Sequence, residues 1–464
     1  MIVVGQGIRF VPLPDPLVRV IVSPMLEYIM NMPFLLKVGI SLLSIVLVNT
    51  FTRQLLAAMV TGVTILTIWC GHTPYSFVDI LIAKTYTADF LLLMTIICQV
   101  MWLSAQMKET KIMDDLVQAV LSRTSGRTAA AILPAMIGLL PMPGGAWFSA
   151  PLVDKCDHKE TLEPDIKTSV NYWFRHIWEA WWPLYPGVLL AIDLSKLEIW
   201  QFVAIQIPVT FVMITIGYLF FLIKFPDHMQ DNGPIDSDKT GVLSILGLLM
   251  PVLVTVITYG AVKASWQLAT NWIDEMPVLN KYLPMVLGLM ISQVYLQIRR
   301  PIPVLKCVSL LITRRTIILV TVVFMVLMYG AVIDSPLPDG MKPVDCIGQE
   351  LDGLGLNLVF MIIALPFIAG MSTGLAVGMV GVSFPVIISL AGENPDLGTI
   401  TSVTALAYIS GYAGMLLSPV HVCLLVTNQY FATSLLRSMR TLIFPIMLLL
   451  VTGLGLYLIY GSLL

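Results

Sequence analysis

Charged side chains are scarce in this sequence of 464 residues: Asp, Glu, Lys and Arg together make up 12% of it, and the formal net charge is −2. Soluble domains carry about 25% charged residues, so 57% hydrophobic residues and a mean hydropathy of +0.88 exclude an ordinary soluble domain. Neither a basic surface for nucleic acid nor room for a soluble catalytic domain is left. We expect a membrane protein that is not an enzyme.

Cysteine is sparse as well. The six cysteines form no CxxC pair and no other metal-ligand spacing. In an apolar segment a cysteine usually packs as a small hydrophobe. We therefore predict no disulfide, no metal site and no cofactor beyond a coupling ion. These cysteines are Cys70, Cys98, Cys156, Cys307, Cys346 and Cys423.

An unbroken apolar stretch is missing at the N-terminus, where Arg9 is followed by Pro12, Pro14 and Pro16. A cleavable signal peptide needs such a stretch. We therefore interpret residues 1–33 as an N-terminal interfacial lead-in.

Long apolar runs are abundant elsewhere. About 20 helical residues cross a hydrocarbon core of roughly 30 Å, so these runs predict an all-α polytopic membrane protein. Two further apolar segments, 128–153 and 354–393, are too broken for spans, and we interpret them as re-entrant helical hairpins. We expect about ten full spans, at 34–51, 54–71, 89–106, 168–194, 197–223, 241–263, 281–298, 316–333, 398–428 and 441–463.

A polar linker at 226–240 divides the chain into a first repeat at 34–225 and a second at 241–464. Short motifs recur in the same order in both halves, which indicates a duplication. The matching motifs are Leu133-Pro134 with Leu365-Pro366, Ser149-Ala150-Pro151 with Ser383-Phe384-Pro385, Tyr172 with Tyr408, and Pro183 with Pro419.

Charge in the loops predicts the orientation. Lys and Arg gather in alternate loops, for example Arg299 to Arg315, whereas 334–352 is acidic. The positive-inside bias then places the N-terminus outside a plasma (inner) membrane. Five crossings in each half is an odd number, so the sequence predicts two inverted repeats of five transmembrane helices, each with a re-entrant hairpin and a broken helix.

Inverted repeats with broken helices are typical of secondary transporters, because non-helical backbone at membrane depth must line protein or a water-filled cavity. The first hairpin is broken around Pro143, Gly144 and Gly145, and the second around Ser372, Thr373 and Gly374. We predict these residues, with Ser149 and Ser418, as substrate-binding. The alternative is that the small residues only allow close helix packing.

The segment 171–179 is the most informative. Asn171, Arg175 and Glu179 are spaced to line one face of a helix. Charges inside a span normally face a cavity, so we predict that Asn171 and Arg175 bind an anion and that His176 and Glu179 are coupling groups. The alternative is a structural Arg175–Glu179 ion pair at the interface. In that alternative a belt of aromatic residues surrounds the pair, namely Tyr172, Trp173, Trp178, Trp181 and Trp182.

The second half lacks these charges. The positions that match 171, 175, 176 and 179 hold Ala407, Gly411, Tyr412 and Met415. The polar residues that it offers around Pro419 are Ser410, Ser418 and His421.

The run LLPMPGGAWFSAPLVD (139–154), followed by NYWFRHIWEAWWPLYPG (171–187), resembles an uncharacterised family of prokaryotic integral-membrane proteins, domain of unknown function 401. That family is similar in layout to the ion-transporter superfamily of divalent-anion/Na⁺ symporters, gluconate permeases, citrate carriers and arsenite pumps. The resemblance implies a dimeric elevator-type carrier with helix breaks near Pro183 and Pro419. The first tip has Pro-Gly-Gly where several superfamily members have Ser-Asn-Thr or Ser-Pro-Thr.

Three functions are compatible with the sequence. The first is transport of a small carboxylate-like anion across the lipid bilayer, coupled to Na⁺ or H⁺, by a homodimer. The second is cation/proton antiport, in which Glu179 titrates and Arg175 is its structural partner. The third is an intramembrane enzyme or a structural membrane subunit, and the sequence has no HExxH motif and no paired carboxylates within spans to support the enzyme. It has no nucleotide motif either, so ATP-driven transport would need another subunit.

Overall fold

The fold is helical, as the composition predicts. The computed structural model describes residues 2–3, 8–9, 32–121, 124, 126–139, 141, 145–157, 162–225, 242–273, 276–337, 340–341, 346, 350, 357–392 and 394–463. Among these, the strands form one antiparallel pair of two residues each, β1 (Ile2–Val3) and β2 (Ile8–Arg9). The lead-in 1–33 and the linker 226–240 lie almost entirely outside the described residues.

The helices alternate between long rods and short segments in both halves. The first half contains α2 (Phe34–Thr52), α3 (Leu55–Trp69), α4 (Pro74–Thr85), α5 (Ala88–Glu109), α6 (Ile112–Leu121), α7 (Gly126–Gly138), α8 (Ala146–Lys155), α9 (Pro164–Arg175), α10 (Pro186–Leu194), α11 (Ile199–Phe220) and the 3₁₀ turn η1 (Leu222–Lys224). The second half contains α12 (Val242–Thr270), α13 (Leu283–Arg299), α14 (Val304–Leu311), α15 (Arg314–Asp334), α17 (Leu358–Thr373), α18 (Ala376–Leu390), α19 (Leu397–Leu416), α20 (Val422–Tyr430) and α21 (Leu435–Leu463).

The apolar helices confirm a multi-pass membrane protein. Within the described residues, six segments are long and apolar enough to cross a bilayer: Phe34–Thr52, Ala88–Glu109, Ile199–Lys224, Ile245–Ala269, Val304–Asp334 and Leu435–Ser462. The expectation of about ten continuous spans was too high. Helices α3 and α13 are shorter, and the segments predicted at 168–194 and 398–428 are each split in two.

Proline explains where those two segments split. Helix α9 stops at Arg175, a run of turns contains Pro183, and α10 restarts with Pro186 at its first position. Helix α19 stops at Leu416, and α20 restarts at Val422, after Pro419. A proline lacks the N–H needed inside a helix but is well accommodated at its first turn. The interruptions therefore follow from the sequence.

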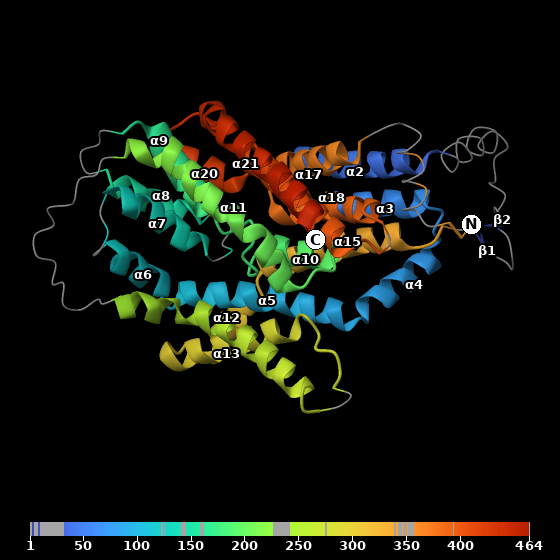
Figure 1. Cartoon of the computed structure of the whole chain (residues 1–464), viewed down its shortest axis with the longest axis horizontal. Coiled ribbons are helices and arrows are strands. Elements are labelled where there is room, and N and C mark those ends of the chain that lie inside the picture. Colours follow the sequence, from blue (N-terminus) through green and yellow to red (C-terminus); the bar gives the residue numbers. More distant parts are fainter. Residues whose placement is uncertain are drawn as a thin grey trace, which may run out of the picture.

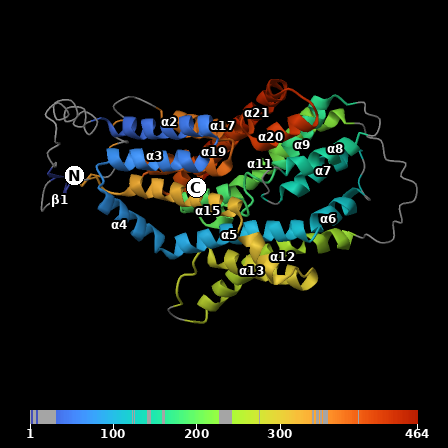
Figure 2. The same cartoon turned by 180° about the vertical axis from the view of Figure 1, so that it is seen from behind.

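Helices α7 and α8 form one helix–turn–helix pair, and α17 and α18 form another, at the places where hairpins were predicted. The two pairs are displaced towards opposite ends of the long axis, α17 and α18 beside α2 and α3 (Figures 1 and 2). Helices α12 and α13 pack together on the flank of the molecule along α5 (Figures 1 and 2).

Several helix contacts are reciprocal between the halves. Helix α8 packs on α20 and α18 packs on α10; likewise α3 packs on α15 and α13 on α5, and α11 on α19 and α21 on α9. In these comparisons α3, α5, α8, α9, α10 and α11 correspond in order to α13, α15, α18, α19, α20 and α21. When corresponding helices are exchanged, one contact of each pair becomes the other. Such reciprocity is what a two-fold relation between two repeats produces.

Candidate functional site

The two helix interruptions lie side by side, and tyrosine hydroxyls join them. Tyr172, on α9, donates to the backbone oxygen of Leu416 at 2.9 Å. Its counterpart Tyr408, on α19, donates to the backbone oxygen of Glu179 at 3.0 Å. Each tyrosine thus satisfies a carbonyl that the other half's helix break has freed. The two breaks are held as one unit.

Two buried histidines meet at this junction. Nε2 of His176 lies 3.0 Å from Nε2 of His421, although the residues are 245 positions apart. Nδ1 of His176 faces the backbone oxygen of Tyr172 at 2.6 Å, and Nδ1 of His421 faces that of Gly374 at 2.7 Å. Both rings are almost completely buried, with 2% and 4% of the residue exposed.

A thiol and two charged groups surround the histidine pair. Cys423, in the first turn of α20, is in hydrogen-bonding contact with both imidazoles and with the guanidinium of Arg175. Arg175 ends α9 and is 4% exposed. Glu179 Oε2 lies 3.8 Å from Nε2 of His176. Cationic, anionic and metal-ligating groups therefore share one buried site.

The prediction that Asn171, Arg175 and Glu179 line one helical face is wrong for Glu179. The helix ends at Arg175, so Glu179 lies among the turns that follow rather than two turns further along a continuous helix. It nevertheless reaches the site, because the chain turns back toward His176.

Asn171 is fully buried one helical turn before Arg175. Its Nδ2 donates to Thr427 Oγ1 at 3.0 Å and, at 3.4 Å, to the backbone oxygen of Ala146. Its Oδ1 has no hydrogen-bond partner among the described residues. An orphaned buried acceptor is costly, so a donor from a ligand or water is expected there.

The tip of the second helix pair reaches the site. Gly374 has φ +62°, in the left-handed region, and its carbonyl accepts the His421 contact. Ser418 donates its hydroxyl to the backbone oxygen of Met371 at 2.6 Å. Ser372 and Thr373 donate theirs to carbonyls one turn back in their own helix, at 2.7 and 2.8 Å. In this conformation the tip therefore offers the site a backbone carbonyl, while the hydroxyls of Ser372 and Thr373 are bonded within their own helix.

The tip of the first pair is described only in part. Pro143 and Gly144 lie outside the described residues. Gly145 precedes α8, and Ser149 is fully buried with its hydroxyl 3.5 Å from the backbone oxygen of Gly145. Close approach of this pair to the break is clear at Gly138, where an added Cβ would collide with the backbone oxygen of Arg175.

The aromatic residues do not form a simple interfacial belt. Tyr172 and Trp173 are fully buried. Trp178 and Trp182 donate their indole N–H groups to the backbone oxygens of Ala135 and Leu139, at 2.8 and 3.0 Å. These side chains bind α7 to the helix break, so the belt alternative is wrong for the two buried ones.

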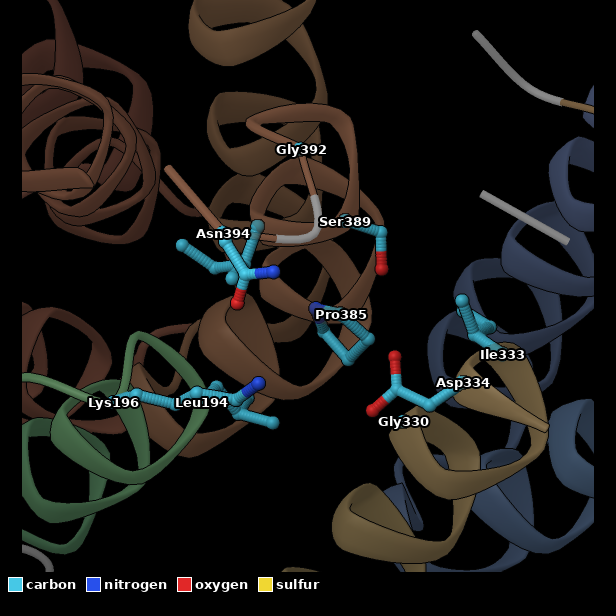
Figure 3. A pocket seen from close by; sticks show the side chains of 10 residues that line it. Leu194, Lys196, Gly330, Ile333, Asp334, Pro385, Ser389, Gly392 and Asn394 are labelled. Carbon is cyan, nitrogen blue, oxygen red and sulfur yellow. The ribbon is translucent and has the colours of Figure 1, made fainter. Parts of the chain in front are cut away.

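A cavity of about 410 Å³ opens where α10, α15 and α18 end. Polar side chains line it at the end of α15 and in the segments that follow α10 and α18, namely Asp334, Lys196 and Asn394, with Pro385 in its wall (Figure 3). Leu194 lines it from the last turn of α10, whose first turn begins just after the helix break. At 1.5 Å per residue, α10 separates the cavity from the break by roughly 12 Å.

Two residues of this site were not predicted as ligands. The sequence indicated that Cys423 packs as a small hydrophobe, and it gave His421 only as a polar residue near Pro419. Their partner His176 is remote in sequence, so no local pattern connects the three residues. The aligned helix breaks are the one signal that could have brought them together.

The comparison with protein families identifies the chain by sequence. Residues 36–461 match the family described as "Protein of unknown function (DUF401)". No curated protein matches the chain. Because the match covers most of the chain, the protein belongs to the DUF401 family, and its apolar helices make it a multi-pass membrane protein.

Proposed function

We propose that this protein is a secondary transporter of a small, carboxylate-like organic anion, coupled to Na⁺ or H⁺. The observation that carries the proposal is the buried Arg175 at the meeting point of two interrupted helices. A guanidinium in a low-dielectric site binds a carboxylate strongly and in a defined orientation. The orphaned Oδ1 of Asn171 supplies an acceptor for a substrate hydroxyl or a water nearby.

The reciprocal packing supports an inverted duplication as the framework. Gly138 and Gly370, matched by sequence, would both collide with backbone oxygens if they carried a Cβ, those of Arg175 and Gly411. Those two carbonyls are also matched by the sequence repeat. In the proposed elevator mechanism, the two helix pairs are re-entrant hairpins that move with the two broken helices across the membrane.

The proposed transporter also has a defined orientation in the membrane and forms a homodimer. Glu350 accepts the N–H groups of Phe34 and Leu35, at 2.6 and 2.7 Å, so the acidic segment and the start of α2 lie together. The positive-inside bias places that side outside the inner membrane. The cavity beside Asp334 is then an outward vestibule, and the exposed apolar faces of α12 and α13 contact lipid or the partner of a homodimer.

The test is a current recording on the purified protein in liposomes on a solid support. Small carboxylates are added with and without gradients of Na⁺ or protons. We expect a substrate-dependent current that Arg175→Ala abolishes and that Arg299→Ala, which removes an exposed arginine, preserves. A current that survives Arg175→Ala would contradict the proposed site.

The contact between Glu179 and His176 favours one alternative, a cation/proton antiporter. In that case no anion produces a current, and a Na⁺ gradient drives a proton flux that Glu179→Gln abolishes. The same liposomes with an internal pH dye distinguish the two functions.

A further inference from the structure

We propose that His176, His421 and Cys423 form a binding site for one soft transition-metal ion, of the Zn²⁺ or Cu⁺ class, between the two helix breaks. Their ligand atoms all lie within 4.8 Å of one another, and all three residues are buried. The site goes beyond anion transport and does not depend on it.

The hydrogen bonds of the two imidazoles carry the argument. A backbone carbonyl can only accept, so Nδ1 of each ring must be the atom that bears hydrogen. In two neutral rings, each Nε2 then presents a lone pair to the other across 3.0 Å. Two facing lone pairs repel, so a positive species belongs between or beside them, either a metal ion or a proton.

The surroundings favour a metal over a shared proton alone. Metal-binding histidines generally donate their second N–H to a carbonyl or carboxylate, which fixes the ring, and both rings here have that partner. Two nitrogens bound to one tetrahedral Zn²⁺ lie about 3.3 Å apart, close to the observed separation. The thiol of Cys423 supplies a third ligand, in contact with both rings.

The ligand types select the class of metal. Imidazole nitrogen and thiolate sulfur suit Zn²⁺ or Cu⁺, whereas Na⁺, Mg²⁺ and Ca²⁺ prefer oxygen. Glu179, 3.8 Å from Nε2 of His176, is close enough to provide a fourth ligand after a small movement.

The test measures metal binding by the full-length protein, purified with a reducing agent and then freed of metal with a chelator. Co²⁺ serves as the spectroscopic probe for Zn²⁺, because a thiolate ligand gives it a charge-transfer band. We expect one metal ion per chain, and the charge-transfer band must disappear in Cys423→Ser. His421→Gln should weaken binding by at least about tenfold.

Cys156→Ser is the matched control, because Cys156 is also a buried free thiol but does not belong to the cluster of His176, His421 and Cys423. It must leave the band and the stoichiometry unchanged. Size-exclusion profiles establish that each variant is folded. Absence of binding by folded wild-type protein, or binding that Cys423→Ser leaves intact, overturns the proposal.

Transport is scored separately in the same preparations. Metal binding without any anion current would refute the proposed function and leave the metal site. An anion current without metal binding would refute the metal site and leave the proposed function. The two histidines would then share a proton instead of a metal ion.

Discussion

The hydroxyl of Tyr412 donates to the backbone oxygen of His176 at 2.5 Å, which joins the intact part of one broken helix to the break of the other. Tyr412→Phe keeps the ring and leaves that buried carbonyl without this donor. The carbonyl still accepts the N–H of Glu179 at 3.0 Å, so the expected cost is that of one hydrogen bond, about 0.5–1.5 kcal/mol, seen as a lower thermal unfolding midpoint in detergent. Tyr218→Phe, at a partly exposed tyrosine on α11, is the control and should behave as wild type. Equal midpoints for both variants would show that this bond contributes nothing.

Gly138 and Gly370 test the relation between the halves. An alanine Cβ at either position would overlap a backbone carbonyl oxygen, that of Arg175 or of Gly411. Backbone cannot move aside as a flexible side chain can. Each Gly→Ala substitution should therefore lower the free energy of unfolding by about 1–3 kcal/mol or more, as overpacking of a core does.

Gly247→Ala is the matched control for this pair, because nothing lies within 4 Å of a Cβ added there on α12. It should be neutral or slightly stabilising, since alanine favours a helix by up to about 1 kcal/mol over glycine. Midpoints of thermal unfolding rank the three variants. Tolerance of alanine at only one of the two matched glycines would argue against equivalent packing in the two repeats.

The sequence was sufficient to predict the helical membrane class and to single out the polar segment around Arg175 and His176, because both depend on local composition. The breaks near Pro183 and Pro419 were implied by the family resemblance, and the structure has them. Hydrophobicity alone predicted continuous spans there, at 168–194 and 398–428. The helix end at Arg175 was missed because nothing in the i, i+4, i+8 spacing of Asn171, Arg175 and Glu179 signals where a helix stops.

The meeting of His176 with His421 and Cys423 could not be predicted from local patterns. It depends on contacts between segments 245 residues apart. Hydrophobicity placed Cys423 inside a span but gave no information about which polar groups faced it. Only the order of matched motifs, with one break in each half, connects those two regions, and it does so without specifying side-chain positions.

We expect the ion pairs of Lys167 to stabilise the fold more than ion pairs at the protein surface do. Its ammonium group lies 2.9 Å from Asp154 Oδ1 and 3.0 Å from Asp157 Oδ2, and the Asp157 side chain is fully buried. Lys167→Met removes the cation from a buried carboxylate that also accepts the N–H of Leu162 at 3.0 Å. We expect the free energy of unfolding to fall by about 3–5 kcal/mol, as it does when one partner of a buried ion pair is removed.

An ion pair with both side chains exposed supplies the comparison. Lys306 Nζ lies 3.4 Å from Glu109 Oε1, and the two side chains are 49% and 41% exposed. Lys306→Met should therefore lower the free energy of unfolding by at most about 1 kcal/mol. Thermal unfolding of the two variants side by side measures the difference, and a similar loss in both would mean that burial does not strengthen the Lys167 pair.

Inverted topology predicts opposite accessibility at Lys155, which ends α8, and Ser335, which follows α15. Each would be replaced singly by cysteine in a variant without the native cysteines, and intact cells would be treated with a membrane-impermeant maleimide. Ser335→Cys should react from outside, because the positive-inside bias predicts that the acidic segment 334–352 lies there. Lys155→Cys should react only after the cells are opened, because the same bias predicts that the first helix pair begins and ends on the cytoplasmic side. Reaction of both from the same side would eliminate the inverted arrangement, since an even number of crossings would then separate them. It would leave the His176–His421 contact unaffected, because that contact depends on the packing of the breaks and not on how the protein is inserted.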